Sequence, residues 1–313
     1  MSASGPGEIR PPRSIGELIT PAARVRIAVV VVLLVLVYWG TIRSQLILRW
    51  LNEGDWSHGW LIPLFSLYFL ATRREQLLRC RPKGSSTGAV VLALSLAMYF
   101  AGAWVYRMAY PQAVSIVGAI FGVTLLLGGW SVIRVAWFPI CFLLFAIPLP
   151  QGLYVQLTMP LREIASSAAA AIMPWFTPGL YTEAQAVVID YVMPGAPAGQ
   201  LNVEEACSGM RLMMAFVALG VAVTYLEERP AWQRIIMILS CVPIAVFCNT
   251  IRVTTTGLLY VHGHQDLARG TPHQLLGILM LMIALGLFLA IGYVLSRLFV
   301  EEPEDGAPGS ASV

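Results

Sequence analysis

Three polar side chains have the types needed for nucleophilic chemistry on a carbonyl group: Cys207, Arg252 and His273. A thiolate is a strong nucleophile, and the N–H groups at a helix N-terminus lower the pKa of a thiol placed there. A guanidinium stays charged and can stabilise a thiolate or a developing oxyanion. An imidazole can take up and return the proton of a leaving amine. Together they can form a catalytic constellation, which is defined by roles and not by order in the chain.

All three residues border strongly apolar segments. Cys207 begins one such segment, Arg252 ends the next, and His273 immediately precedes the last. Because successive membrane helices alternate in direction, a start, an end and a start fall on one side of the bilayer. Each residue alone has an ordinary explanation, as a packed cysteine, an interfacial anchor or a polar helix start. Their shared depth is what predicts a site.

The composition indicates a chain that is solvated by lipid. The 313 residues are 58% hydrophobic and 12% charged, with a mean hydropathy of +0.73. A soluble domain has about 25% charged residues, so a water-exposed surface is hard to build here. Lipid-facing positions must be apolar, which removes the difficulty. The net charge of +3 gives no strongly basic face, and we expect no nucleic-acid partner.

The apolar runs predict an all-α polytopic membrane protein with about eight transmembrane helices, since a span needs about 20 apolar residues. Between the fifth and sixth, residues 155–176 are expected to form an interfacial or re-entrant helix. The β-branched run Thr182–Val192 then predicts a small extracytoplasmic β-hairpin region. The expected spans are Val25–Arg43, Gly59–Thr72, Thr87–Tyr106, Gln112–Trp130, Val135–Leu149, Cys207–Leu226, Ile235–Arg252 and Gln274–Leu298.

The basic residues orient these spans, because cytoplasmic loops carry an excess of Lys and Arg. The segment Arg73–Lys83 and the N-terminal arm belong inside, and parity then puts the long region after Pro150 and the loop after Arg252 outside. The expected organisation is a disordered cytoplasmic arm (1–24), a transmembrane domain (25–299) with an extracytoplasmic insert at about 176–206, and a disordered acidic tail (300–313).

A metal site is a weaker interpretation of the polar residues. His262 and His264 form an H-x-H pair with Asp266 close by, and zinc sites can use such spacing. The chain has no H-E-x-x-H motif, and a histidine pair in a short polar loop is not specific. We therefore expect neither a metal nor a cofactor.

Four sequence motifs carry a resemblance to a known family. The stretch EACSGMR around Cys207 resembles the central motif of the exosortase/archaeosortase family, NTIR ending at Arg252 resembles its second motif, and His273 in HQLLG resembles its third. The stretch NEGDWSHGWLIPLFSLY resembles the family's N-terminal signature, with Trp56 in place of the usual tyrosine. The resemblance runs from about Asn52 to the last span.

The resemblance implies a membrane cysteine transpeptidase or protease of the bacterial inner membrane, with its active site on the extracytoplasmic face. Its partners would be exported proteins with a C-terminal sorting signal, which consists of a short motif, a transmembrane helix and a basic cluster. By resemblance, Cys207 is the nucleophile that forms an acyl-thioester, Arg252 a proton donor or oxyanion stabiliser, and His273 the third catalytic group.

Other functions remain open at this point. In a transporter or channel, Arg252 and His273 would line a pathway, although the inverted repeat of many transporters is not visible. In a non-catalytic subunit of an envelope polysaccharide export system, all three residues would be replaceable. A glutamate-type intramembrane protease would need E-E-x-x-x-R, and Gly209 stands where that arginine belongs. A G-x-S-x-G elbow is also absent.

Overall fold

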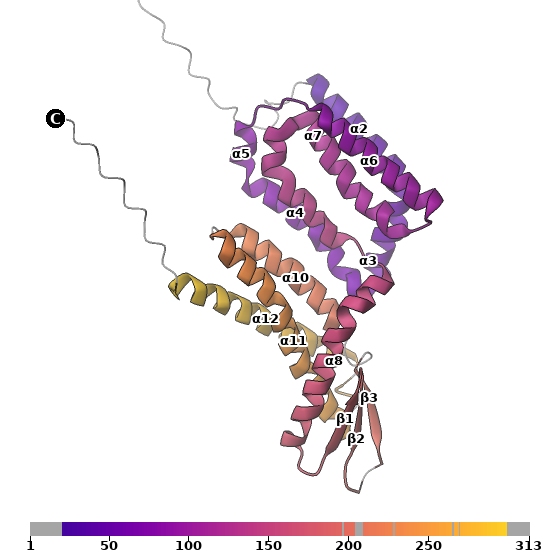
Figure 1. The fold of residues 1–313 in the computed structure, drawn as a ribbon, viewed down its shortest axis with the longest axis vertical. Helices are drawn as coiled ribbons and strands as arrows, with labels where there is room; N and C mark the ends of the chain where they lie inside the picture. Colours follow the sequence, from indigo (N-terminus) through magenta and orange to yellow (C-terminus); the bar gives the residue numbers. More distant parts are fainter. Residues whose placement is uncertain are drawn as a thin grey trace, which may run out of the picture. The chain divides into compact units, whose positions relative to one another are not determined.

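A computed structural model describes residues 21–195, 197–203, 209–227, 229–264, 266–268 and 270–298. Within these ranges the side chains of residues 23, 209–212, 270–271 and 273–274 are not described. The chain is mostly helical (Figure 1) and divides into two compact units, Met1–Tyr154 and Val155–Val313.

The described residues of unit 1 form helices and no strand. The long apolar segments form α-helices, and two of them end in π-helical turns, η1 and η3. Its elements are α2 (Pro21–Thr41), η1 (Ile42–Ile47), α3 (Leu48–Asn52), η2 (Gly54–Trp60), α4 (Leu61–Thr72), α5 (Arg74–Arg79), α6 (Ser86–Phe100), η3 (Ala101–Val105), α7 (Ala109–Phe142), η4 (Leu143–Ala146) and the first turn of α8 (Gln151–Phe176). Residues 21–24 are helical as part of α2.

The helix α7 has a sharp internal break at Gly129, where φ is +72° and ψ is −172°. A side chain at Gly129 would also collide with the carbonyl oxygen of Lys83, so only glycine fits this turn. The arm before the break packs closely on α6, where a Cβ on Gly122 would lie 2.7 Å from the amide nitrogen of Leu92. The arm after it packs on α4, where the Ser66 hydroxyl donates to the carbonyl of Pro139 at 2.6 Å.

The expected count of about eight spans is not confirmed. Among the described residues, five helical segments are long and apolar enough to cross a membrane: Arg24–Asn52, Ser86–Val105, Ala109–Ala146, Ala231–Val261 and Leu275–Leu298. Two expected spans, the fourth and fifth, fall in the single helix α7, which Gly129 divides. The expected second span, α4, has 12 residues and is too short for this criterion. Of the expected sixth span, the part with described side chains, Met213–Leu226, is a shorter apolar helix.

Among its described residues, unit 2 combines a small sheet with the helices α8, α10, α11 and α12. The rest of α8 leads into three antiparallel strands, β1 (Tyr181–Gln185), β2 (Val188–Val192) and β3 (Gly199–Asn202), in the order β1-β2-β3. The predicted hairpin is confirmed, with Gln185 paired to Val188 across its turn. The third strand was not predicted. Three helices follow: α10 (Gly209–Leu226), α11 (Ala231–Val261) and α12 (Gly270–Leu298).

The sheet is attached to the helices by an apolar cluster and a hydrogen bond. Ile189 of β2 and Leu201 of β3 are buried against Ala165 and Ala169 of α8 and Val253 of α11. The Thr182 hydroxyl of β1 also donates to the carbonyl of Ala170 at 2.6 Å. Burial of these apolar side chains fixes the sheet against α8 and α11.

The helix α11 is longer than expected. The sequence predicted that it ends at Arg252, but it continues to Val261, and Gly263 at φ +79° ends it. The amide of His264 donates to the carbonyl of Leu259 at 2.9 Å, and that of Gly263 to the carbonyl of Tyr260 at 3.2 Å. This is a Schellman C-terminal cap, in which glycine supplies the left-handed residue. The H-x-H pair, His262 and His264, is therefore part of the C-terminal cap of α11.

Candidate active site

The helices α10, α11 and α12 pack around a common apolar core that includes Phe216, Met237, Cys241, Met280 and Phe288. Two glycines let these helices approach closely. A Cβ on Gly220 of α10 would collide with the sulfur of Cys241 on α11, and a Cβ on Gly292 of α12 would lie 3.1 Å from Cε of Met237. These contacts fix which residues of the three helices lie side by side.

The same contacts set the level of Arg252. Arg252 lies fifteen residues beyond Met237 on α11, and fifteen residues before Gly292 on the antiparallel α12 is Gly277. Likewise, eleven residues separate Cys241 from Arg252, and eleven residues before Gly220 is Gly209, the first residue of α10. The backbone positions of Gly209, Arg252 and Gly277 therefore share one level of the bundle.

Arg252 is deeply buried at this level, with 2% of its surface exposed. Together with Asn249, which is 6% exposed, it lines a cavity of about 30 Å³ between the three helices. The remaining lining is apolar or weakly polar: Met213, Phe216, Ala245, Cys248, Met280, Leu281 and Ala284. A cavity of this size holds about one water molecule. Keeping a guanidinium in such surroundings costs free energy, and within membrane-spanning segments such charges usually serve function.

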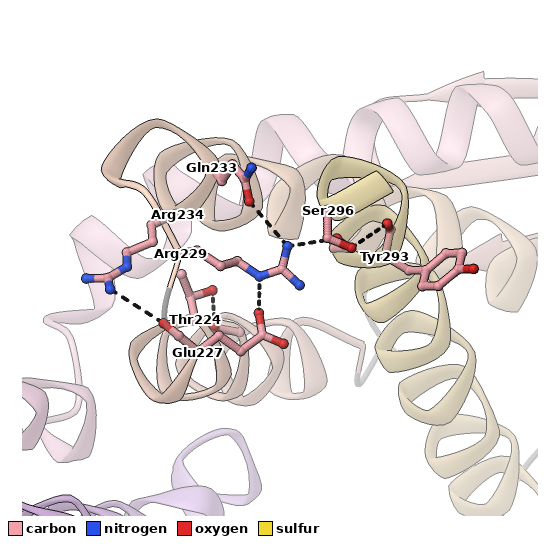
Figure 2. A network of polar contacts seen from close by, with 9 residues as sticks. Thr224, Glu227, Arg229, Gln233, Arg234, Tyr293 and Ser296 are labelled. Carbon is pink, nitrogen blue, oxygen red and sulfur yellow. Dashed lines mark hydrogen bonds and ion pairs between the residues drawn. The ribbon is translucent and has the colours of Figure 1, made fainter. Parts of the chain in front are cut away.

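The opposite end of this bundle carries a polar clamp (Figure 2). The side chain of Arg229 lies between the turn that joins α10 to α11 and the last turns of α12. Its Nε donates to Glu227 at 2.5 Å, and its Nη1 donates to the carbonyl of Gly292 at 2.8 Å and to Gln233 at 3.4 Å. Arg234 and Arg297 lie at the same end, where Arg297 stacks 5.4 Å from the ring of Tyr293. Positive charge is therefore concentrated at one end of unit 2. The sheet and the C-terminal end of α11 lie away from this end.

The chain matches a known family of membrane proteins. A family model described as transmembrane exosortase matches residues 50–290, well over half of the chain. The chain belongs to the transmembrane exosortase family. The match covers all four motifs that carried the resemblance. Neither a search of curated proteins nor a search of solved structures finds a match to this exosortase-family chain.

The three site residues predicted for this exosortase are described to different extents. Arg252 is described in full, and it is the 22nd residue of the 31-residue helix α11. It therefore lies inside the helix, where the prediction put it at the end. His273 is in the first turn of α12, one helical turn before Gly277, and its side chain is not described. Cys207 lies outside the described residues, two positions before Gly209 in the sequence. The structure thus puts Arg252 at one level with Gly209 and Gly277, which are close in sequence to Cys207 and His273. The contacts of the Cys207 and His273 side chains are not described.

Asn249 was missed as a site residue, although it lies in the NTIR motif. It is three residues before Arg252, which puts both on one face of a helix. A polar residue one turn from an intramembrane arginine is a signal that could have found it. Arg162 on α8 is a second buried arginine, with 6% of its surface exposed.

The N-terminal signature forms a separate polar cluster in unit 1. The hydroxyl of Tyr154 donates to Oδ2 of Asp55 at 3.1 Å, and Trp56 lies between the rings of His58 and Tyr154, 5.9 Å from each. Burial lowers the pKa of His58, and the carbonyls of Phe145 and Asp55 and the Asp55 charge act against it more weakly. His58 is therefore neutral at pH 7. In the described part of the chain, no group of three or more metal-binding side chains is present.

Proposed function

We propose that this exosortase-family protein is a membrane-embedded cysteine transpeptidase that cleaves the C-terminal sorting signal of exported proteins. Its single strongest support is the burial of Arg252, which lines a cavity between α10, α11 and α12 at the level of Gly209 and Gly277. Two residues of chain span at most about 7 Å, so Cys207 cannot be far from Gly209. One helical turn is roughly 5.4 Å, so His273 is similarly close to Gly277.

In the proposed reaction, the thiolate of Cys207 attacks a peptide carbonyl of the sorting signal. The guanidinium of Arg252 donates hydrogen bonds to the resulting oxyanion. When the carbon–nitrogen bond breaks, His273 gives a proton to the departing amine, and the acyl group remains on sulfur as a thioester. An amine or a water molecule then attacks this thioester, loses a proton to His273, and releases the thiolate.

The proposed orientation follows from charge. Arg229, Arg234 and Arg297 gather at the end of unit 2 opposite the stop of α11, and excess Lys and Arg belong to the cytoplasm. This puts the sheet and the site on the extracytoplasmic side of a bacterial inner membrane. A substrate helix would lie beside the bundle with its basic end in the cytoplasm, in agreement with the same rule.

Processing of a co-expressed exported protein that ends in a sorting signal tests the proposal. Cys207→Ala should abolish the shortened product while the variant still inserts into the membrane. Cys141→Ala, which removes a thiol from α7 in unit 1, is the matched control and should process normally. Mass spectrometry of a trapped complex should find the acyl group on Cys207. Normal processing by Cys207→Ala would exclude this mechanism, and solute flux that is indifferent to Cys207→Ser would instead support a transporter.

A further inference from the structure

A large apolar hollow, open on one side, lies between α2, α5 and α7 of unit 1. Its volume is about 400 Å³, which falls within the roughly 300–1,000 Å³ typical of ligand pockets. It is lined on one side by Ile27, Val31 and Leu34 of α2, and on the other by both arms of α7 around Gly128. The segment after α5 closes one end with Cys80 and Pro82.

Beyond the hollow, α2 and α7 are in direct contact. Near the end of α2, the Tyr38 hydroxyl donates to the carbonyl of Ser115 at 3.3 Å, and Thr41 donates to Gln112 at 3.2 Å. Two to three turns earlier in α2, at the level of Val31, the helix borders the hollow. We call this space, which reaches from α2 and α7 to Cys80 and Pro82, the wedge.

The walls of the wedge offer nothing to a polar ligand. The Thr124 hydroxyl donates to the carbonyl of Ile120 at 2.7 Å, within its own helix. The Cys80 thiol is 3.3 Å from the carbonyls of both Gln76 and Ser131. Burial raises the pKa of this thiol, so it stays protonated and uncharged at neutral pH. An apolar cavity without free hydrogen-bonding groups stays dry and accepts hydrocarbon.

Basic residues flank the two residues of the segment after α5 that line the wedge. Arg79, Arg81 and Lys83 alternate along the chain with Cys80 and Pro82, which line the hollow. All three basic side chains are exposed, and within the described residues none of them forms an ion pair or a side-chain hydrogen bond. The segment from 73 to 83 carries a single acidic residue. The three basic residues are next in sequence to two residues that line the hollow, so their long side chains can reach an anionic group bound at that end.

We propose that this wedge is a binding site for one phospholipid with an anionic headgroup. One acyl chain fills the space between α2 and α7, and the phosphate is held by Arg79, Arg81 and Lys83. Basic pockets between membrane helices on the cytoplasmic side are suited to anionic lipids. All the residues involved belong to unit 1, whereas the proposed active-site residues belong to unit 2, so each proposal can fail without the other.

Lipid binding to the purified full-length protein in non-ionic detergent tests the site. The probes are phosphatidylglycerol, phosphatidylcholine with the same acyl chains, and glycerol phosphate, measured by native mass spectrometry and by the melting temperature. We expect phosphatidylglycerol to bind and to raise the melting temperature, and the other two to do neither. Equal binding of phosphatidylcholine would overturn the charge argument, and binding of glycerol phosphate alone would overturn the acyl-chain argument.

Matched variants locate the site. Replacing Arg79, Arg81 and Lys83 by Gln should weaken phosphatidylglycerol binding by at least about tenfold, because each charge near the headgroup contributes to affinity. Val31→Trp should abolish binding by filling the wedge. Leu33→Trp, at an exposed position of α2 that does not line the hollow, and Arg43→Gln, in η1, should leave it unchanged. Unchanged binding by Val31→Trp would refute the site.

Discussion

Replacing Arg252 by methionine separates its role in chemistry from its role in packing. Methionine is also long and unbranched, so it can occupy the same space between α10, α11 and α12. The adjoining cavity of about 30 Å³ has room for about one water molecule, so solvent can replace only part of the guanidinium's hydrogen bonding. Losing one donor to an oxyanion typically costs about 10²- to 10³-fold in rate, or roughly 2.7–4 kcal/mol. We expect a loss of processing of this size.

The assay is the initial rate of processing of a co-expressed sorting substrate, divided by the amount of folded enzyme. Arg162→Met is the matched control, because Arg162 is also buried in unit 2 but does not line the cavity. It should change the melting temperature and leave the rate within a few fold. Arg252→Lys keeps the charge without the planar fork and should fall between wild type and Arg252→Met. A rate for Arg252→Met above a third of wild type, in a folded variant, would refute the reasoning.

Three further predictions concern unit 1. Gly129→Ala should destabilise the protein by about 2 kcal/mol or more, because alanine at φ +72° is strained and its methyl group meets a backbone carbonyl; Gly286→Ala, with no atom within 4 Å of its Cβ, should be neutral or stabilising in the same denaturation assay. Tyr154→Phe should cost about 1.5–3 kcal/mol by removing the hydrogen bond to Asp55, and an unchanged melting temperature would contradict this. Because burial lowers the pKa of His58, the unfolded chain binds its proton more readily, so stability should fall as pH drops from about 6.5 toward the lowered pKa. His58→Gln should remove that part of the pH dependence, measured as melting temperature against pH.

Helical content and the hairpin could be predicted because local pattern decides them. Apolar runs of span length predict helices, and the β-branched run before Pro194 gave strands β1 and β2. The third strand, Gly199–Asn202, has only four residues and is defined by its pairing to β2, which local pattern does not encode. The end of α11 was predictable, since Val253–Val261 contains no helix breaker and Gly263 follows it. The prediction gave the charge of Arg252 too much weight as a mark of the membrane boundary.

The candidate site was less predictable than the fold. The sequence identified Arg252 and the helices that surround it, but the level at which they meet depends on Gly220 and Gly292, whose close contacts arise only on packing. The cavity and the position of Asn249 beside it follow from that packing. The wedge in unit 1 is lined by residues of α2, α5 and α7, so it is a tertiary feature with no trace in any one of these helices alone.

The clamp at Arg229 gives the three-helix bundle of unit 2 a fixed pivot. Hydrogen bonds from one guanidinium join the α10–α11 turn to the backbone of α12 at the basic end. Around Arg252, many turns away, the described lining is mostly apolar and contains a small void. When these helices move, the clamped end should therefore stay fixed. Their displacement should be largest at the far end, where a polypeptide would have to enter. Removing the hydrogen bonds of Arg229 would change the separation of the helices at the far end, although no residue at that end is altered.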